Sequence, residues 1–337
     1  MHMTPFEQAS YLTQARRFRE MATAVVNQYP IKVRSIEFIK YSANAIFKIT
    51  DHSDKKYMLR ISPANFHTKE AMLEEFEWLN SILNSTEISV PKPIYNHAGQ
   101  YIVEHQHPGI TGVRYCALFE WVEGRHLWNA INKKYAYHVG ALTAQLEKSG
   151  QRIKCKHRLY WNAESLLGTT QPRYANLEQL TGVPHEQNEV IKIARRCAYA
   201  KLKEYEHKHP EKLGLIHEDL NPNNIIIQKG RYNVIDFDDC GVGFYGYDLA
   251  EPLCAFEHLA EGEKKKDFSA LKEALYQGYA DQIPLTQDDI DMIPYFLLVR
   301  KLNTVGALAL RKHNPKMRPW FLKTVERAVS FFKYGGF

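Results

Sequence analysis

Apolar and polar residues alternate with a period of two in several short segments of the first third of the chain. These segments are rich in β-branched and aromatic residues, a pattern that predicts β-strands. They lie at 31–40, 45–50, 56–62, 101–106 and 115–122. The polar sequence DHSDKK, which follows the second segment, is typical of a hairpin turn. The alternation therefore predicts an antiparallel sheet.

Helical spacing of apolar residues occurs before these strands and once between them. Residues 4–29 carry apolar positions at mixed helical spacing and predict one or two amphipathic helices. Residues 67–83 place Met72, Phe76 and Leu79 on one face, which predicts a single helix. This helix has to end before the prolines of VPKPI, because proline cannot continue a helix.

The pattern changes after residue 122, where helical spacing dominates. Helices are predicted at 127–148, 187–208, 266–281 and, in pieces, 287–335, and strands at 213–216, 224–228 and 232–237. A sheet-rich first part and a helix-rich second part predict an α+β protein of two lobes, 1–122 and 123–337. We expect a ligand cleft between the lobes, since such clefts commonly hold ligands.

Composition narrows the class of protein. The 337 residues are 45% hydrophobic, which is enough for a sizeable core. The net charge is +6, but Lys and Arg are scattered, so we expect no nucleic-acid partner. No apolar run approaches the ~18 residues that cross a bilayer, so we expect no membrane partner. The five cysteines form no Cys-x-x-Cys pair, which favours the cytoplasm and argues against a zinc site. Nothing in the sequence indicates the oligomeric state.

One polar cluster interrupts two apolar runs, in LIHEDLNPNNIII at 215–227. His217, Asp219 and Asn224 fit the pattern H-x-D-L-x-x-x-N, the catalytic loop of kinases. In that pattern the Asp accepts the proton of the acceptor hydroxyl, and the Asn holds Mg²⁺. The alternative is a turn stabilised by Asn and Asp side chains that bond their own backbone.

A second motif favours the catalytic interpretation. Twelve residues after Asn224, and directly after the strand-like run YNVI, Asp236 and Phe237 match the start of the D-F-G magnesium motif. Two hard oxygen ligands on separate loops can hold Mg²⁺ against nucleotide phosphates. A third carboxylate can then accept the proton of the incoming hydroxyl. The spacing therefore predicts Asn224 and Asp236 as metal ligands and Asp219 as the catalytic base.

The two motifs together, GLIHEDLNPNNIII and YNVIDFDDCGVGFYGYDLAEPL, resemble the aminoglycoside phosphotransferase and choline kinase-like family. The resemblance covers roughly residues 35–315 and is nearest to the branch of stress-response kinases and type II homoserine kinases. It implies a bilobal protein-kinase-like fold. It also implies ATP and Mg²⁺ as cofactors and transfer of the γ-phosphate to a hydroxyl group.

The resemblance also assigns residues to the phosphates. The turn with Ser42, Ala43 and Asn44 would cover them through backbone N–H groups, although a plain polar hairpin is the alternative. Arg60 stands where kinases have the phosphate-pairing Lys. Lys48 on the preceding strand is its rival.

Further assignments concern the partner of this cation and the adenine. Glu75 matches the family's Glu that pairs with this cation, and Glu74 is the second candidate for that role. The alternative is that both simply belong to an exposed helix face, which commonly carries glutamates. The backbone of Glu120 and Val122 would face adenine, although an ordinary edge strand is the alternative. Asp248 would brace the catalytic loop.

His217 would orient the catalytic loop rather than act as a base, because kinases use Asp for that role.

The chain departs from the family pattern at three places. Asp238 replaces the Gly of D-F-G and is followed by Asp239. Glu218 stands where protein kinases have an Arg that reads an activation-loop phosphate, so we expect no switching of that sort. Glu147 replaces a His that the family usually has.

The acidic residues around the transfer site suggest the acceptor. Glu218, Asp238 and Asp239, with Glu251 further on, would concentrate a cationic ligand, so we expect an amine next to the phosphorylated hydroxyl. The alternative is that Asp238 and Asp239 cap nearby backbone N–H groups. We expect the acceptor pocket to come from residues 125–175 and 250–335.

The sequence thus predicts an ATP- and Mg²⁺-dependent phosphotransferase that acts on a small molecule such as an aminoglycoside, an amino alcohol or a homoserine-like compound. Two alternatives stay open: a Ser/Thr protein kinase of the bacterial stress-response type, and a nucleotide-binding pseudokinase.

Overall fold

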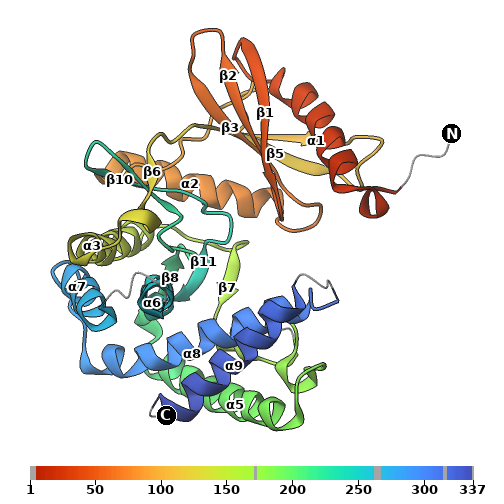
Figure 1. Ribbon diagram of the computed structural model, residues 1–337. Helices are drawn as coiled ribbons and strands as arrows, with labels where there is room; N and C mark the ends of the chain where they lie inside the picture. Colours follow the sequence, from red (N-terminus) through yellow and green to blue (C-terminus); the bar gives the residue numbers. More distant parts are fainter. Residues whose placement is uncertain (1–4, 171–172, 262–266, 314–316, 336–337) are drawn as a thin grey trace. The chain divides into compact units, whose positions relative to one another are not determined.

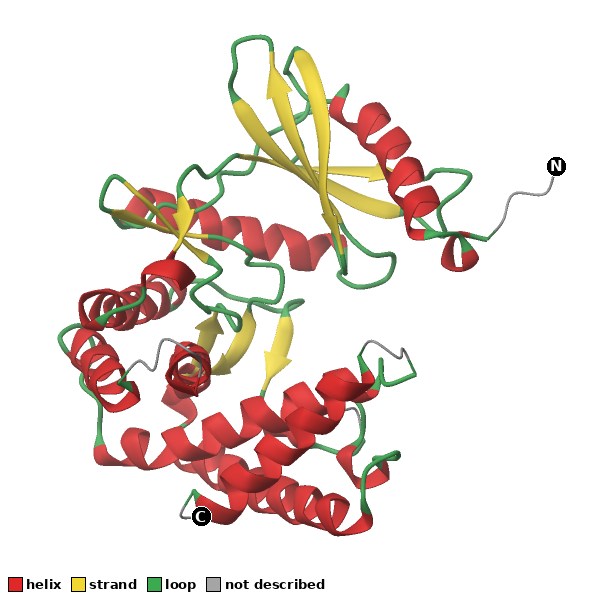
Figure 2. Ribbon diagram, viewed as in Figure 1, coloured by secondary structure: helices red, strands yellow, loops and turns green. Residues whose placement is uncertain are grey.

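The computed structural model describes residues 5–170, 173–261, 267–313 and 317–335 (Figures 1 and 2). The chain divides into two compact units. The first contains Met1–Arg125, Lys154–Arg158 and Ile226–Asp238, and the second contains His126–Ile153, Leu159–Ile225 and Asp239–Phe337. The units are therefore not contiguous in sequence, because two later segments belong to the first one.

A five-stranded antiparallel sheet forms the centre of the first unit, with the strand order β1-β2-β3-β5-β4. Its strands are β1 (Val33–Tyr41), β2 (Ala45–Asp51), β3 (Lys56–Ile61), β4 (Ile102–His105) and β5 (Arg114–Glu120). One face carries Phe47, Ile49 and Leu59, which belong to the buried core of this unit. The other face carries Arg60, which pairs with Ala117 on β5. Strand alternation thus sends Arg60 away from that core.

Two helices pack in the first unit. Helix α1 (Tyr11–Val26) follows a short 3₁₀ turn (Phe6–Gln8) and adds Phe18, Met21 and Val25 to the buried core. Helix α2 (Lys69–Ser85) begins at Thr68, whose side chain accepts from the Ala71 N–H group. The ring of Phe76 on α2 lies 5.4 Å from that of Phe119. Helix α2 therefore contacts the sheet on the side of Arg60.

A later segment completes the first unit. Strands β9 (Ile225–Gln228) and β10 (Arg231–Val234) form a small sheet with β6 (Arg125–His126). The Val234 N–H group donates to Ser89 O at 2.9 Å, and the ring of Phe237 meets Trp78 edge-on at 5.2 Å. This packing places the residues after β10 beside α2.

The second unit is mainly helical (Figure 2). Its small sheet has the order β7-β11-β8, from β7 (Leu159–Trp161), β11 (Gly241–Phe244) and β8 (Leu213–Ile216). Its helices include α3 (Lys133–Gly150), α4 (Ala163–Leu167), α5 (His185–Lys208), α6 (Tyr245–Glu261), α7 (Phe268–Ala280), α8 (Gln287–Ala309) and α9 (Arg318–Tyr334). Helices α3 and α7 approach closely, because a Cβ atom added at Gly140 would lie 1.9 Å from Leu275 O.

The predicted α+β class with an antiparallel first sheet and a helical second part is confirmed. The pattern does not predict α6, β7 or β11. It also extends the strand at 232–237 too far, since β10 ends at Val234. Among the described residues, no helix is both long and apolar enough to cross a membrane.

Candidate active site

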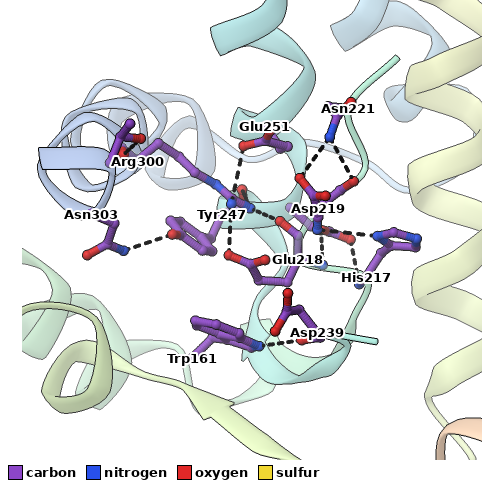
Figure 3. A network of polar contacts seen from close by, with 12 residues as sticks. Trp161, His217, Glu218, Asp219, Asn221, Asp239, Tyr247, Glu251, Arg300 and Asn303 are labelled. Carbon is purple, nitrogen blue, oxygen red and sulfur yellow. Dashed lines mark hydrogen bonds and ion pairs between the residues drawn. The ribbon is translucent and has the colours of Figure 1, made fainter. Parts of the chain in front are cut away.

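The predicted base lies in the loop between β8 and β9, in the second unit (Figure 3). The Asp219 carboxylate accepts two hydrogen bonds, from Asn221 Nδ2 at 2.8 Å and from Asn224 Nδ2 at 2.7 Å. The Asp219 N–H group lies 3.3 Å from His217 Nδ1. Asp219 is partly exposed, whereas His217 is fully buried. Two side chains of the same loop therefore orient the Asp219 carboxylate, which stays accessible to solvent.

The orientation of Asn224 follows from these bonds. An ionised carboxylate accepts hydrogen bonds only, so the Asn224 NH₂ group has to face Asp219. That group donates to both Asp219 Oδ2 and Asp219 O, at 2.7 and 2.8 Å. The amide oxygen then points elsewhere, and such an oxygen is the kind of ligand that Mg²⁺ prefers.

A buried carboxylate braces this loop. Asp248, at the start of α6, accepts from the backbone N–H groups of His217 at 3.0 Å and of Glu218 at 2.7 Å. Burial raises the pKa of Asp248, although His217 and these two N–H groups oppose the rise. Asp248 thus links the start of α6 to two backbone N–H groups of this loop.

The cation on β3 and its partner on α2 come together in the first unit. Arg60 Nη1 and Nη2 each lie 2.8 Å from one oxygen of Glu75, in a fork geometry. Both side chains are almost fully buried, at 4% and 1% exposure. The rival Lys48 instead bonds Glu37 at 2.9 Å. Of the two candidate cations, Arg60 is therefore the one that meets Glu75.

Glu74 has a different surrounding. Its carboxylate accepts from the backbone N–H groups of Lys156, His157 and Arg158, at distances of 2.9–3.2 Å. Burial raises its pKa, but these bonds outweigh burial and lower it. Glu74 thus holds the segment 154–158 on the first unit.

Asp238 lies with Arg60, in the first unit. Its carboxylate is 3.3 Å from Arg60 Nη1 and accepts from Asn44 Nδ2 at 2.8 Å. Burial raises the pKa of Asp238, but Arg60, His67 and Asn44 outweigh it, so the pKa is lowered. The predicted acceptor residues Glu218 and Asp239 belong to the second unit.

Asp236 has a conformation that suits exposure of its carboxylate. Its φ is +69°, in the left-handed region that residues other than glycine rarely adopt. The residue is exposed, and its negative charge helps to raise the pKa of Arg60 against the effect of burial. An exposed carboxylate beside the Arg60 cluster fits a ligand for a hard cation.

The β1–β2 turn and the segment with Glu120 and Val122, which are predicted to hold the nucleotide, are also in the first unit. Ser42 is exposed in the β1–β2 turn, and its N–H group donates to Asn44 O at 3.3 Å. The Glu120 N–H group donates to Lys92 O at 2.9 Å, and the Trp121 N–H group to Lys56 O at 3.1 Å. These bonds hold the chain that leads from β5 to Val122. Strand β5 lies between β3 and β4, so the alternative of an ordinary edge strand is wrong.

A second buried cluster lies directly beside the catalytic loop (Figure 3). Arg300 on α8 contacts the carboxylates of Glu218 at 2.9 Å and Glu251 at 3.2 Å. Burial raises the pKa of Glu251 to about 7, and that of Glu218 also rises well above its usual range, although Arg300 opposes both. Asp239 bonds Arg173 at 3.1 Å.

Sequence reasoning missed Arg300, His67 and Arg158. Arg300 carried a signal, because it lies in the apolar run YFLLVRKL of a helix, where a charged residue needs a buried partner. His67 and Arg158 stand beside ordinary polar residues, so the pattern offers no signal for them.

Glu147, which departs from the family pattern, contacts neither cluster. It is buried on α3 and accepts a hydrogen bond from the Tyr279 hydroxyl of α7. Burial raises its pKa to about 7. It links two helices of the second unit.

Comparisons with known proteins identify the family of the chain. Residues 36–270 match the phosphotransferase enzyme family. Amicoumacin kinase of Bacillus subtilis (strain 168) is 22% identical over 292 residues, which are 83% of this chain and 82% of that protein.

Two solved structures share the fold over nearly the whole chain. A microcompartment-associated aminopropanol kinase has a TM-score of 0.78 at 23% identity and covers 94% of each chain. An amicoumacin kinase in complex with AMP-PNP, Ca²⁺ and Ami has a TM-score of 0.77 at 20% identity, over 95% of this chain and 96% of that one. The predicted resemblance and the kinase-like fold are confirmed. On the match that spans more than two thirds of its length, this chain belongs to the phosphotransferase enzyme family.

Proposed function

We propose that this phosphotransferase moves the γ-phosphate of ATP, with Mg²⁺, to a hydroxyl group of a small molecule that bears an amine. The observation that carries the proposal is the Asp219 carboxylate, which two carboxamides orient while it stays partly exposed. A carboxylate in this state is suited to accept the proton of an incoming hydroxyl. Asp219 is therefore the proposed base.

The residues present fit ATP and Mg²⁺. The amide oxygen of Asn224 and the exposed carboxylate of Asp236 are hard oxygen ligands, and Mg²⁺ commonly takes one or two protein oxygens together with phosphates. Mg²⁺, when bound, neutralises the charge of the phosphates. Arg60, which Glu75 holds in place, would contact the phosphates.

The β1–β2 turn and the segment at the end of β5 would hold the rest of the nucleotide. Ser42 and Asn44 would cover the phosphates from the turn, and the backbone at Glu120 and Val122 would bind adenine.

As the acceptor site we propose a groove that lies entirely in the second unit, between α6, α7, α8 and α9. Its volume is about 740 Å³, and it is lined by Cys254, Glu257, His258, Ala260, Glu261, Phe268, Lys301, Lys323, Glu326, Arg327, Ser330, Phe331, Tyr334 and Gly335. Glu251 and Cys254 are one turn apart on α6, so the groove begins about 5 Å along the helix from the Arg300 cluster. A groove of this size among helices favours a small acceptor over a protein.

The balance of charge beside the base favours an amine. Glu218 and Glu251 share the single guanidinium of Arg300, and Asp219 acts electrostatically on both of them. Three carboxyl groups therefore share one guanidinium, and a cationic ligand beside them would favour their ionised forms. Two relatives are named for acceptors with an amine, aminopropanol and amicoumacin, which supports the same class.

A matched pair of acceptors tests the proposal. We expect ADP release from Mg-ATP with 1-amino-2-propanol, an aminoglycoside or amicoumacin to exceed that with propane-1,2-diol, which lacks the amine of 1-amino-2-propanol. Homoserine and a macrolide complete the panel, and the Asp219→Asn variant serves as the blank. A neutral or anionic acceptor as the best substrate would contradict the amine, and no turnover with any acceptor would contradict the phosphotransfer.

A further inference from the structure

The backbone of Glu218, immediately before the proposed base, is in a conformation that a glutamate rarely adopts. Its φ is +75°, in the left-handed region where a Cβ atom is disfavoured and glycine is not. The side chain at this position is also buried, at 8% exposure. A residue that is both strained and buried has to be held there by its contacts.

Arg300 on α8 supplies those contacts (Figure 3). Its Nη1 lies 2.9 Å from Glu218 Oε1, and its Nη2 donates to Glu218 O and, at 3.3 Å, to Tyr247 O. The guanidinium also stacks on the Tyr247 ring, 3.7 Å from its centroid. It is thus fixed by a side chain, two carbonyl groups and an aromatic face.

These bonds act on the peptide that leads into Asp219. Arg300 holds the carbonyl oxygen of Glu218, which belongs to the peptide group between residues 218 and 219. Asp248 holds the N–H groups of the two preceding peptides. Two helices, α6 and α8, therefore fix three successive peptide groups before the base.

We propose that Arg300 is a positioning residue for phosphoryl transfer, and that Glu218 is the built-in anion that anchors it to the catalytic loop. The proposal rests on the proposed function, in which Asp219 is the base. Because both partners belong to the chain, the loop would be held in its active form without phosphorylation.

Two variants separate this role from simple stabilisation. Glu218→Gly removes the anchoring carboxylate. The glycine can adopt a φ near +75° without strain, so the fold should survive. Arg300→Lys keeps the charge and loses the fork that reaches side chain and carbonyl together. Arg196→Lys is the matched control, since Arg196 forms an exposed ion pair with Glu178 on the same unit.

Steady-state kinetics give the first readout. With Mg-ATP and 1-amino-2-propanol, or with water as the acceptor if that alcohol is inert, kcat should fall ~10–100-fold in both variants, because small misplacements of a catalytic group have effects of that order. The KM for ATP and the rate of Arg196→Lys should stay unchanged. A KM effect with unchanged kcat would overturn the proposal.

Amide hydrogen exchange gives a readout that needs no turnover. We expect exchange at residues 217–219 to accelerate ~10-fold or more in both variants while the rest of the second unit keeps its protection. Unchanged exchange at these amides, or an equal acceleration throughout the unit, would overturn the proposed positioning role of Arg300 and Glu218. If the wild-type protein turned over no acceptor, the proposed function would fail. The exchange data would still decide whether Arg300 and Glu218 hold the loop at residues 217–219.

Discussion

Replacing Glu147 by Gln should stabilise the protein much more at alkaline pH than at acid pH. Glu147 is buried, and burial raises its pKa from 4.5 to about 7. A carboxyl group whose pKa is higher in the folded state binds its proton more tightly there. It therefore contributes stability below pH 4.5, and this contribution is lost as the pH rises through 7.

The magnitude follows from the size of the rise. At about 1.4 kcal/mol per pKa unit, a change from 4.5 to about 7 corresponds to roughly 3 kcal/mol. Gln has the same shape and carries no charge, and its amide oxygen can still accept the hydrogen bond from Tyr279. Glu147→Gln should thus be stabilising by only ~1 kcal/mol at pH 5, where the carboxyl of the unfolded chain is already mostly ionised, and by ~3 kcal/mol at pH 8.

Urea unfolding of both proteins at pH 5, 6, 7 and 8 and constant ionic strength measures this difference. Glu204→Gln is the control, because Glu204 is an exposed partner of Lys201 on α5 and its replacement should change little at any pH. Comparing variants at each pH removes the contributions of Glu218 and Glu251, which all of the proteins share. A stability gain that is the same at pH 5 and pH 8, or a loss at pH 8, would refute the reasoning.

Three further predictions concern the active site. Asp219→Asn should keep Mg-ATP affinity and lower kcat ~10²–10⁴-fold, and a near-normal rate would show that Asp219 is not the base. Asp236→Ala should weaken binding of Mg-ATP in a calorimetric titration, because it removes a carboxylate from a hard cation; equal affinity in both proteins would contradict this assignment. Arg60→Lys should raise the KM for ATP moderately and Arg60→Ala strongly, whereas Lys48→Ala should leave it unchanged; the reverse order would assign the phosphates to Lys48.

The sequence predicts those parts of the fold whose pattern is local. The strands of the first sheet and the helix at 67–83 have clear periodicity, and the structure contains them with small shifts of their ends. Strand β11 escapes prediction because Gly241 and Gly243 are poor strand formers; they are needed because a Cβ atom at Gly241 would lie 2.3 Å from Leu159 O. Helix α6 escapes because it begins with Tyr-Gly-Tyr and contains Pro252.

The candidate site divides in the same way. Motifs with fixed spacing predict Asp219, Asn224 and Asp236 as site residues, and these roles stay predictions. The structure shows the contact of Arg60 with Glu75 that the resemblance implies. The contact of Asp238 with Arg60 depends on packing between residues 178 positions apart, which no local pattern encodes. The same holds for Arg300, which reaches the catalytic loop from 82 residues away.

The division of the first unit among three chain segments has a consequence for synthesis of the protein. When residues 1–125 have emerged from the ribosome and the next residues are being added, Asn233, Phe237 and Asp238 have not yet been synthesised. Until those residues emerge, Trp78 lacks its aromatic neighbour and Arg60 lacks one of its two carboxylates. Synthesis of the first unit therefore begins first, but its folding cannot be completed until residues up to Asp238 have been synthesised. An N-terminal fragment that ends at residue 125 should expose apolar surface and aggregate, whereas one that ends after residue 238 would carry every segment of this unit.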